Sequence, residues 1–334
     1  MTEFDIAVLI GRFQPFHHGH GGLLRKALDT APRIVVVLGS AFAAPSPRNP
    51  FSAAQREAMI RSWLSPEENA RTAFVPQRDV WNSKRWARDV HRSVSSIAQG
   101  RVALVGYHKD GTSAYLDTFP EWTMIDAGRQ GPLDATPLRR QILSNTPWSE
   151  VEGSLQGAVP DSVLALLGQW AREDLRSRLA ADQEAIETYQ ARWGKGPFLT
   201  VDAVVKACDH ILLIRRGARP GIGLRALPGG FLDPHEALED GARRELLEET
   251  GLDLGALQAT GTRMFAHPGR SARARIVTHA FLFEPVWTSL PEVTAADDAL
   301  DARWIPISEL AAMEDEFFGD HFHIIDQMLG ILDT

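Results

Sequence analysis

Three glutamates at helical spacing are the residues of this chain whose types and positions most directly indicate chemistry. Glu245, Glu248 and Glu249 belong to the stretch 230–252, GFLDPHEALEDGARRELLEETGL. Residues three and four apart on a helix share a face, so these carboxylates repel one another unless a cation neutralises them. Hard oxygen ligands of this kind suit Mg²⁺. The alternative interpretation is an ordinary solvated acidic helix face.

The element that carries these glutamates is expected to be a helix. The stretch begins like a loop, with glycines and a proline, and then favours helix from about Glu236 to Thr250, with Gly251 placed to end it. Its fixed positions resemble the Nudix box, GX5EX7REUXEEXGU with U aliphatic, without any departure. Nudix enzymes hydrolyse a pyrophosphate that links a nucleoside to another group.

The Nudix resemblance implies roles for five residues of the box. It implies that Glu245, Glu248 and Glu249 bind the catalytic metal, with Glu245 and Glu249 also acting in catalysis. It further implies that Glu236 and Arg244 brace the loop against the helix. The metal, Mg²⁺ with Mn²⁺ as the alternative, would polarise the pyrophosphate and generate hydroxide from water.

A second group of residues with chemical potential follows the first apolar strand, which is expected over residues 4–10. The decapeptide 11–20, GRFQPFHHGH, precedes a helix expected to start near Gly21, and a second strand is expected over 34–38. This is a βαβ unit, and such units bind ligands at the carboxyl ends of their strands. His17 and His20 can each donate to a phosphate oxygen there. A zinc site and structural histidines are the alternatives.

The decapeptide resembles the signature GxFxPxHxGH of nucleotidyltransferases with a Rossmann-like fold. The form Gly-Arg-Phe-Gln-Pro-Phe-His is closest to archaeal-type nicotinamide mononucleotide (NMN) adenylyltransferases. The resemblance implies that ATP and NMN are substrates and that His17, His20 and Arg139 act in catalysis. The residues that it implies for substrate binding are Gly11, Arg12, Phe13, Arg48, Asn82, Trp86 and Thr136.

Two later stretches carry the narrower resemblance. Arg48 begins an RNPFSA segment, and its guanidinium is expected at the phosphates. In RDVWNSKRW, Asn82 is expected to hydrogen-bond the carboxamide of NMN, and Trp86 is expected to stack on the cationic pyridinium ring, a favourable cation–π pair. Plain core packing is the alternative role for Trp86.

A second phosphate-binding helix end is expected in the stretch 133–140, LDATPLRR. Thr136 is expected to cap the helix and Pro137 to be its first residue. The segment resembles the family motif ISxTxxR, whose threonine and arginine hold the ATP phosphates, which implies this role for Thr136 and Arg139. It departs from the motif at Asp134, where the family often has serine.

The reaction implied at this first site is a direct displacement. The 5′-phosphate of NMN attacks the α-phosphorus of ATP in line, and pyrophosphate leaves. No protein nucleophile is needed, so catalysis consists of positioning and charge stabilisation by the histidines, the arginines and Mg²⁺.

Beyond the box, a basic turn, HPGRSARAR, leads into a strand expected over residues 276–283. A basic turn is usually only solvated. This one resembles the PGRxxRxR segment of ADP-ribose pyrophosphatases, which implies that Arg270 and Arg273 contact phosphate or ribose of ADP-ribose. The sequence ADDA, residues 296–299, also resembles those enzymes and would add a carboxylate.

Composition limits the classes of protein to which the chain can belong. It has 334 residues, 44% of them hydrophobic, and a net charge of −8, which disfavours a duplex-binding surface. We therefore expect small-molecule partners and no nucleic-acid partner.

No apolar run reaches the length of a membrane span, so we expect no membrane insertion. Cys208 is the only cysteine; we expect a small buried residue and a cytoplasmic location. The chain is either a monomer or a homo-oligomer.

These observations predict an α/β protein with two domains. Residues 1–172 should form a Rossmann-like nucleotidyltransferase domain with a parallel sheet, 173–196 a connecting helix and linker, and 197–334 an α/β/α Nudix domain with a mixed sheet. The predicted function is bifunctional: NMN adenylyl transfer and hydrolysis of ADP-ribose. The alternatives are another adenylyltransferase whose Nudix domain acts on a different nucleoside diphosphate derivative, and a second domain that only senses ADP-ribose.

Overall fold

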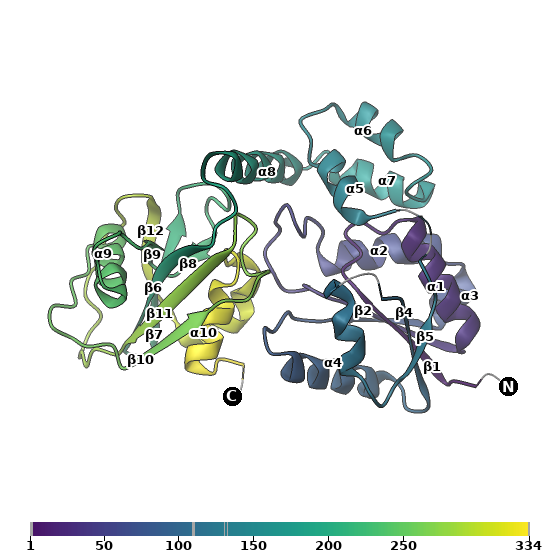
Figure 1. Ribbon diagram of the computed structural model, residues 1–334, viewed down its shortest axis with the longest axis horizontal. Helices are drawn as coiled ribbons and strands as arrows, with labels where there is room; N and C mark the ends of the chain where they lie inside the picture. The colour runs from purple at the N-terminus through teal and green to yellow at the C-terminus, as the bar shows by residue number, and fades with distance from the viewer. Residues whose placement is uncertain (1–2, 109–110, 130, 132, 333–334) are drawn as a thin grey trace. The chain divides into compact units, whose positions relative to one another are not determined.

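The computed structural model describes residues 3–108, 111–129, 131 and 133–332. The chain forms two compact units, Met1–Ala180 and Ala181–Thr334. The division lies inside the long helix α8 (Asp174–Trp193), so this helix belongs to both units (Figure 1).

The first unit is built on a parallel sheet of five strands in the order β3-β2-β1-β4-β5 (Figure 1). This order places the topological switch point between β1 and β4, where α/β proteins bind their ligands. It confirms the expected Rossmann-like parallel sheet. The strands are β1 (Ile6–Gly11), β2 (Arg33–Leu38), β3 (Thr72–Pro76), β4 (Val102–Gly106) and β5 (Thr123–Asp126).

Helices cover both faces of this sheet because successive strand residues alternate between two apolar cores. Leu9 and Val36 pack with Leu24 of α1 on one face, whereas Val8 and Val35 pack with Val90 of α4 on the other. The helical elements are α1 (His18–Thr30), α2 (Ala53–Trp63), α3 (Pro66–Ala70), α4 (Ser83–Ile97), the 3₁₀ segment η1 (Gly111–Thr118), α5 (Ala135–Ile142), α6 (Trp148–Leu155) and α7 (Asp161–Trp170).

Two helix starts of the first unit differ from the sequence-based expectation. Helix α1 begins at His18 rather than near Gly21, because the His17 side chain caps it by accepting from the Gly19 N–H. Helix α5 begins at Ala135, so Thr136 lies inside its first turn and is not the cap. The Thr136 hydroxyl instead accepts from Arg139 (3.0 Å).

The second unit contains a mixed sheet of seven strands with the path β10-β11-β6-β7-β12, to which β8 and β9 are added (Figure 1). Strands β6 and β11 are parallel and the other pairs are antiparallel. The expected mixed sheet is therefore confirmed. The strands are β6 (Phe198–Ala207), β7 (His210–Arg216), β8 (Arg225–Ala226), β9 (Gly229–Phe231), β10 (Gly261–Phe265), β11 (Ile276–Phe283) and β12 (Ala299–Pro306).

Helices lie on both faces of this sheet as well, as an α/β/α unit requires. Helix α9 (Leu238–Thr250) covers one face through Leu246, which packs with residues of β6 and β7. The 3₁₀ segment η2 (Ile307–Glu316) and α10 (His321–Leu329) cover the other face. Helix α9 ends as predicted at Gly251, which adopts φ 67°, a left-handed conformation that glycine favours.

Three sequence-based expectations about the second half of the chain need correction. Helix α9 begins at Leu238 rather than Glu236, because the Glu236 carboxylate is used to bind the loop. The helix expected through 161–193 is broken after Trp170 into α7 and α8. Cys208 is not buried: it is exposed in the turn between β6 and β7.

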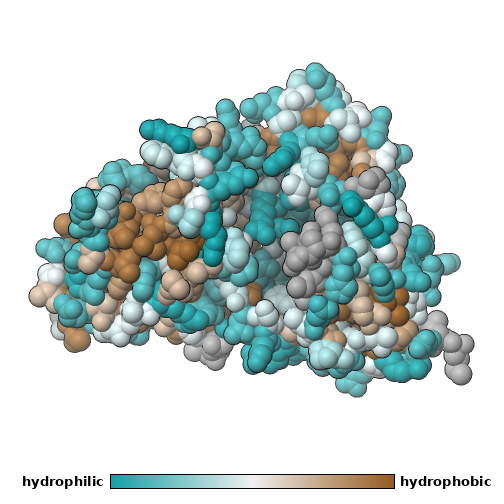
Figure 2. Space-filling model, viewed as in Figure 1, coloured by the Kyte–Doolittle hydropathy of each residue, from teal (hydrophilic) through white to brown (hydrophobic). Residues whose placement is uncertain are grey.

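Figure 2 shows mainly hydrophilic side chains on the visible face, with a larger group of hydrophobic side chains on the second unit. Among the described residues, no helix is both long and apolar enough to cross a membrane.

Candidate active sites

The turn after β1 is tied to its neighbours by hydrogen bonds at the carboxyl end of the sheet. Gly39 N–H donates to Gly11 O (3.0 Å), which joins the ends of β2 and β1. The buried amide of Gln14 donates to Phe51 O (2.9 Å) and accepts from Phe51 N–H (3.0 Å). These bonds hold the turn and the RNPFSA segment together at the candidate site, although they are far apart in the sequence.

The two histidines of this turn lie face to face. Their ring centroids are 3.7 Å apart and stacked, and the Phe13 ring meets His20 edge-on at 4.9 Å. Burial holds the pKa of His20 well below its usual range, and the nearby His17 and Arg139 lower it further. His20 is therefore neutral at pH 7 before a ligand binds, and an arriving phosphate favours its protonation.

Three arginines converge beside the histidines. Burial lowers the pKa of Arg139 to about 10, and repulsion from Arg12 and Arg48 contributes. The pKa of Arg12 is lowered by burial and then by Arg48. Arg139 is held in place by donating to Gln14 O (2.9 Å) and to the hydroxyl of Thr136. Three cations gathered in this way provide a site for a polyphosphate.

Arg56 is a residue of this site to which the sequence gave no role. Its side chain is fully buried, and its Nη1 donates to Arg12 O (2.8 Å) and to Gly39 O (2.7 Å), while Nη2 donates to Ser40 O (3.4 Å). Through these contacts Arg56 holds together the turns that follow β1 and β2. A lone arginine in a helix gives no sequence signal for such backbone contacts.

The residues expected to bind the nicotinamide ring begin helix α4. Asn82 caps the helix by accepting from Arg85 N–H (3.0 Å), so its side-chain oxygen is used locally. Trp86 meets Tyr115 and Phe119 edge-on, at 5.9 and 5.8 Å between centroids. Trp86 is partly exposed, so it takes part in an aromatic cluster and also presents surface to a ligand.

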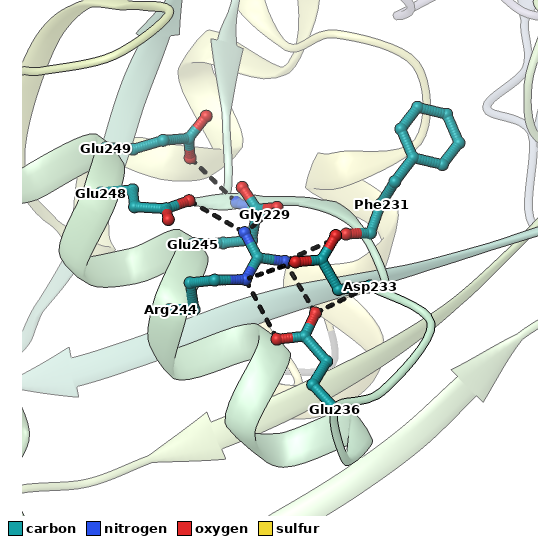
Figure 3. A network of polar contacts seen from close by, with 8 residues as sticks. All are labelled: Gly229, Phe231, Asp233, Glu236, Arg244, Glu245, Glu248 and Glu249. Atoms are coloured by element: carbon teal, nitrogen blue, oxygen red, sulfur yellow. Dashed lines mark hydrogen bonds and ion pairs between the residues drawn. The ribbon is translucent and has the colours of Figure 1, made fainter.

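In the second unit, Arg244 is the centre of the polar network around the box glutamates (Figure 3). It pairs with both oxygens of Glu236 (3.0 and 2.7 Å) and donates to Phe231 O (3.1 Å). Its Nη1 also donates to Glu245 (2.9 Å) and Glu248 (2.8 Å). The predicted brace is therefore present in the structure, and it extends to two of the three expected metal ligands.

Glu249 lies deeper than the other box glutamates. It is 4% exposed and accepts from Gly229 N–H (2.9 Å). Burial and a hydrogen bond with Asp298 raise its pKa to about 9. Burial also raises the pKa of Glu245. Asp298, one of the two aspartates of the ADDA segment, thus lies beside Glu249.

These carboxylates suit a hard divalent cation by the chemistry of their oxygens and by their shared negative charge. Among the residues that the structure describes, no three His, Cys, Asp or Glu side chains converge as a metal site. Two of the box glutamates, Glu245 and Glu248, instead pair with Arg244. Glu245 also lies close to the loop: a Cβ on Gly230 would lie 2.5 Å from its Oε1, so a side chain there would have to displace the carboxylate.

The two arginines of the basic turn have different surroundings. Arg270 forms a buried two-point ion pair with Asp320, with both distances 2.9 Å. Arg273 instead faces the rings of Tyr189, Phe231 and Phe318, at 6.0, 5.8 and 5.8 Å from its guanidinium carbon. The structure therefore places Arg273, and not Arg270, beside open aromatic surface.

Arg216, at the end of β7, belongs to the same region and was missed by sequence analysis. Its guanidinium stacks on Phe318 (4.2 Å). Burial lowers its pKa, and the charges of Asp298 and Glu249 oppose that shift. Arg216 therefore lies between the carboxylates and the aromatic surface.

Two family models match the chain. Residues 8–93 match the model described as cytidylyltransferase-like, and residues 196–328 match the NUDIX domain model. The first match includes the histidine turn, and the second includes the glutamate helix.

Individual relatives match each unit or the whole chain. A nicotinamide/nicotinic acid mononucleotide adenylyltransferase from Acinetobacter baylyi is 35% identical over 183 residues, which are 54% of this chain and 93% of the relative. The crystal structure of a bifunctional NMN adenylyltransferase/ADP ribose pyrophosphatase from Francisella tularensis is 33% identical, with a TM-score of 0.88, and the match covers 98% of this chain and 99% of that one. A crystal structure of such a protein from the same organism, complexed with AMP and Mn ion, is 32% identical, with a TM-score of 0.87 and the same coverage.

Proposed function

The chain belongs to the family of bifunctional NMN adenylyltransferase/ADP-ribose pyrophosphatases, and we propose that it catalyses both reactions at two separate sites. The observation that carries this proposal is the presence of two sites of opposite charge, each on its own sheet. The arginines and histidines of the first unit suit the phosphates of ATP and NMN. The carboxylates of the second unit suit a metal-dependent hydrolase.

In the first unit the proposed reaction makes NAD⁺ and pyrophosphate. The 5′-phosphate of NMN attacks the α-phosphorus of ATP, and the bond from that phosphorus to the β-phosphate oxygen breaks. His17 and His20 hold the phosphate near the start of α1, while Arg12, Arg48 and Arg139 offset the charge of the leaving pyrophosphate. Asn82 and Trp86 bind the nicotinamide half, and Gly11, Phe13 and Thr136 shape the ATP side.

In the second unit the proposed reaction splits ADP-ribose into AMP and ribose 5-phosphate by adding water across the pyrophosphate. Glu245, Glu248 and Glu249 would hold the metal, and Asp298 is close enough to Glu249 to assist. Arg244 bonds to one oxygen of Glu245 and one of Glu248, and the remaining oxygens would be available to the metal. Arg273 and Arg216 would meet the negative charge of the substrate.

The metal proposed for both sites is Mg²⁺, with Mn²⁺ as the alternative. A divalent ion bound at either site supplies charge neutralisation of phosphate oxygens and, in the hydrolase, an activated water. The Mn ion in the Francisella tularensis crystal supports a divalent metal for this family. The substrates are small and charged, and we place the protein in the cytoplasm, where such nucleotides are made and used.

The test is incubation of the purified chain with each substrate set and identification of the products. ATP, NMN and Mg²⁺ should give NAD⁺ and pyrophosphate. ADP-ribose with Mg²⁺ or Mn²⁺ should give AMP and ribose 5-phosphate. A protein that binds ADP-ribose in the presence of metal and leaves it intact would favour a sensing role for the second unit.

A further inference from the structure

Strands β1 and β4 separate before they reach the carboxyl end of the first sheet. On one side, β1 is paired with β2 as far as Gly11 and Leu38. On the other side, its pairing with β4 ends at Val8 and Leu104. The last residues of β1, which lead into the phosphate turn (residues 11–17), therefore have a paired strand on one side only.

The Ile10 carbonyl lies beyond the end of the ladder between β1 and β4. Successive carbonyls of an extended strand point to opposite neighbours. Gly11 O accepts from Gly39 N–H (3.0 Å) on the β2 side, so Ile10 O points toward β4. A carbonyl at this place needs a donor from outside the sheet, because leaving it unpaired costs free energy.

The hydroxyl of Tyr115 is this donor. Tyr115 belongs to η1, 105 residues later in the chain, and its hydroxyl donates to Ile10 O (2.9 Å). Burial raises the pKa of Tyr115 to about 12, and the nearby Tyr107 contributes to the shift. The hydroxyl therefore keeps its proton, and the hydrogen bond persists, throughout the neutral pH range.

The segment that carries Tyr115 is anchored on β4. Leu116 is 6% exposed, and a Cβ on Gly106, the last residue of β4, would lie 3.2 Å from its Cδ2. Leu116 thus packs on the end of β4, while its neighbour Tyr115 reaches β1. The 3₁₀ segment η1 therefore bridges the two strands at the place where they separate.

The ring of Tyr115 contacts the nicotinamide side of the candidate site. Trp86 meets this ring edge-on, with the centroids 5.9 Å apart. Ile10, Trp86 and Tyr115 all pack against the same apolar core. One side chain thus contacts both the strand that leads into the phosphate turn and the residue proposed to bind the nicotinamide ring.

We propose that Tyr115 is a positioning residue of adenylyl transfer, whose hydroxyl fixes the phosphate turn and whose ring fixes Trp86. This rests on the proposed synthesis of NAD⁺ and adds to it a residue that acts through its neighbours. The 5′-phosphate of NMN must be in line with ATP while the nicotinamide ring is held at Trp86. The placement of the turn relative to Trp86 therefore decides how well the reacting atoms are aligned.

Single-turnover formation of NAD⁺ by the full-length chain tests this proposal. Tyr115→Phe keeps the ring and removes only the donor to Ile10 O. Its rate at saturating ATP and NMN should fall about five- to tenfold, as expected for one lost hydrogen bond that aligns the reacting groups. The KM for NMN and the KM for ATP should stay within about twofold. Tyr115→Leu also removes the aromatic contact with Trp86, so it should in addition raise the KM for NMN about two- to tenfold.

Thr30→Val is the matched control. It also removes one hydroxyl that donates to a backbone carbonyl, that of Lys26 (2.7 Å), but at the C-terminal end of α1. Its single-turnover rate and both KM values should equal those of the wild type. Urea unfolding of each variant identifies a purely structural role for Tyr115. In that case Tyr115→Phe would unfold at lower urea concentration and the folded protein would keep the wild-type rate.

An unchanged single-turnover rate in Tyr115→Phe overturns the proposal, and so does a rise in both KM values without a loss of rate. Amide hydrogen exchange gives a second measurement that needs no substrate. Residues 9–20 should exchange faster in Tyr115→Phe than in the wild type and in Thr30→Val, and equal exchange in all three proteins contradicts the proposal. If the wild type forms no NAD⁺, the proposed function fails separately, and the exchange comparison then decides whether Tyr115 holds the turn.

Discussion

The two candidate sites have opposite electrostatics. In the first unit, burial and then Arg48 lower the pKa of Arg12, and burial and then Arg12 lower that of Arg139; the pKa of the neighbouring His20 is lowered as well. In the second unit, buried Glu249 has a pKa raised to about 9, and that of Glu245 is also raised. Each site therefore concentrates one sign of charge, which favours a ligand of the opposite sign.

This difference indicates how each unit recognises phosphates. The cations of the first unit can contact the phosphates of ATP and NMN directly. The carboxylates of the second unit would repel a pyrophosphate, so the proposed substrate requires a divalent metal there, and we expect Arg216 and Arg273 to meet its remaining charge. Removing a charge should consequently act on one reaction and leave the other unaffected.

The largest expected effect is that of Glu249→Gln on hydrolysis. The change keeps the size of the side chain but removes a metal-ligand charge, so the rate of ADP-ribose hydrolysis should fall by about 10³-fold or more. NAD⁺ synthesis by the same preparation should remain within about twofold of the wild type. Product formation from each substrate set, measured side by side, checks both statements.

Persistence of hydrolysis in Glu249→Gln would remove this residue from the metal site. A parallel loss of NAD⁺ synthesis would show that the two sites are coupled, which contradicts the independence expected from their separate sheets. Asp240→Asn, at an acidic position in the first turn of the same helix, is the matched control and should preserve both activities.

The second effect concerns the opposite site. His20→Ala should lower the turnover of NAD⁺ synthesis by about 10²–10³-fold, as is typical when one donor to a developing charge is lost. Hydrolysis of ADP-ribose should be unchanged. His18, exposed and next to His17, provides the control: His18→Ala should retain nearly full activity. Wild-type turnover in His20→Ala would leave His20 with a packing role beside Phe13.

The third effect is on stability and depends on pH. A carboxyl whose folded-state pKa is raised binds more protons when folded, so its presence lowers the free energy of unfolding as pH rises from about 4.5 toward 9. At pH 7 this penalty is about 3 kcal/mol. Without metal, Glu249→Gln should therefore unfold at higher urea concentration than the wild type, and the difference should vanish near pH 4.

Divalent metal should make the wild type more stable than Glu249→Gln. Metal that binds only the folded wild type stabilises it by mass action, while Glu249→Gln gains little. Urea titrations at pH 4, 7 and 9, with and without Mn²⁺, measure the difference in stability between the two proteins under each condition. A variant less stable than the wild type at pH 7 in a chelator would show that Glu249 is ionised and well paired when no metal is bound.

The sequence predicted the elements that have strong local patterns. The two parallel strands β1 and β2, the glutamate helix and its glycine stop all follow from hydrophobic runs and spacing. The start of α1 was wrong by about one turn, because His17 caps the helix with its own side chain, and histidine is not a usual capping residue.

Other features depend on contacts that no local pattern encodes. Arg215 and Arg216 are neighbours on β7 and must point to opposite faces, but only the fold shows that Arg215 pairs with Glu316 while Arg216 faces Phe318. Similarly, Arg270 and Arg273 share one basic turn. Asp320, 50 residues later, is what takes Arg270 into an ion pair.

The smallest expected effect tests how the first unit binds the nicotinamide end of its substrate. Trp86 is partly exposed and is supported edge-on by Tyr115 and Phe119. Its indole face is then available to the cationic pyridinium ring of NMN. A cation–π contact contributes about 0.5–2 kcal/mol, so Trp86→Ala should raise the KM for NMN by about 2- to 30-fold.

The KM for ATP should change little in Trp86→Ala, because the arginine and histidine contacts to the triphosphate remain. Trp86→Phe keeps an aromatic face and should recover most of the loss. Initial rates at varied NMN and at varied ATP measure the two constants separately. Equal increases in both would mean that Trp86 acts through packing on Tyr115, whose hydroxyl donates to Ile10 O (2.9 Å) next to the phosphate turn.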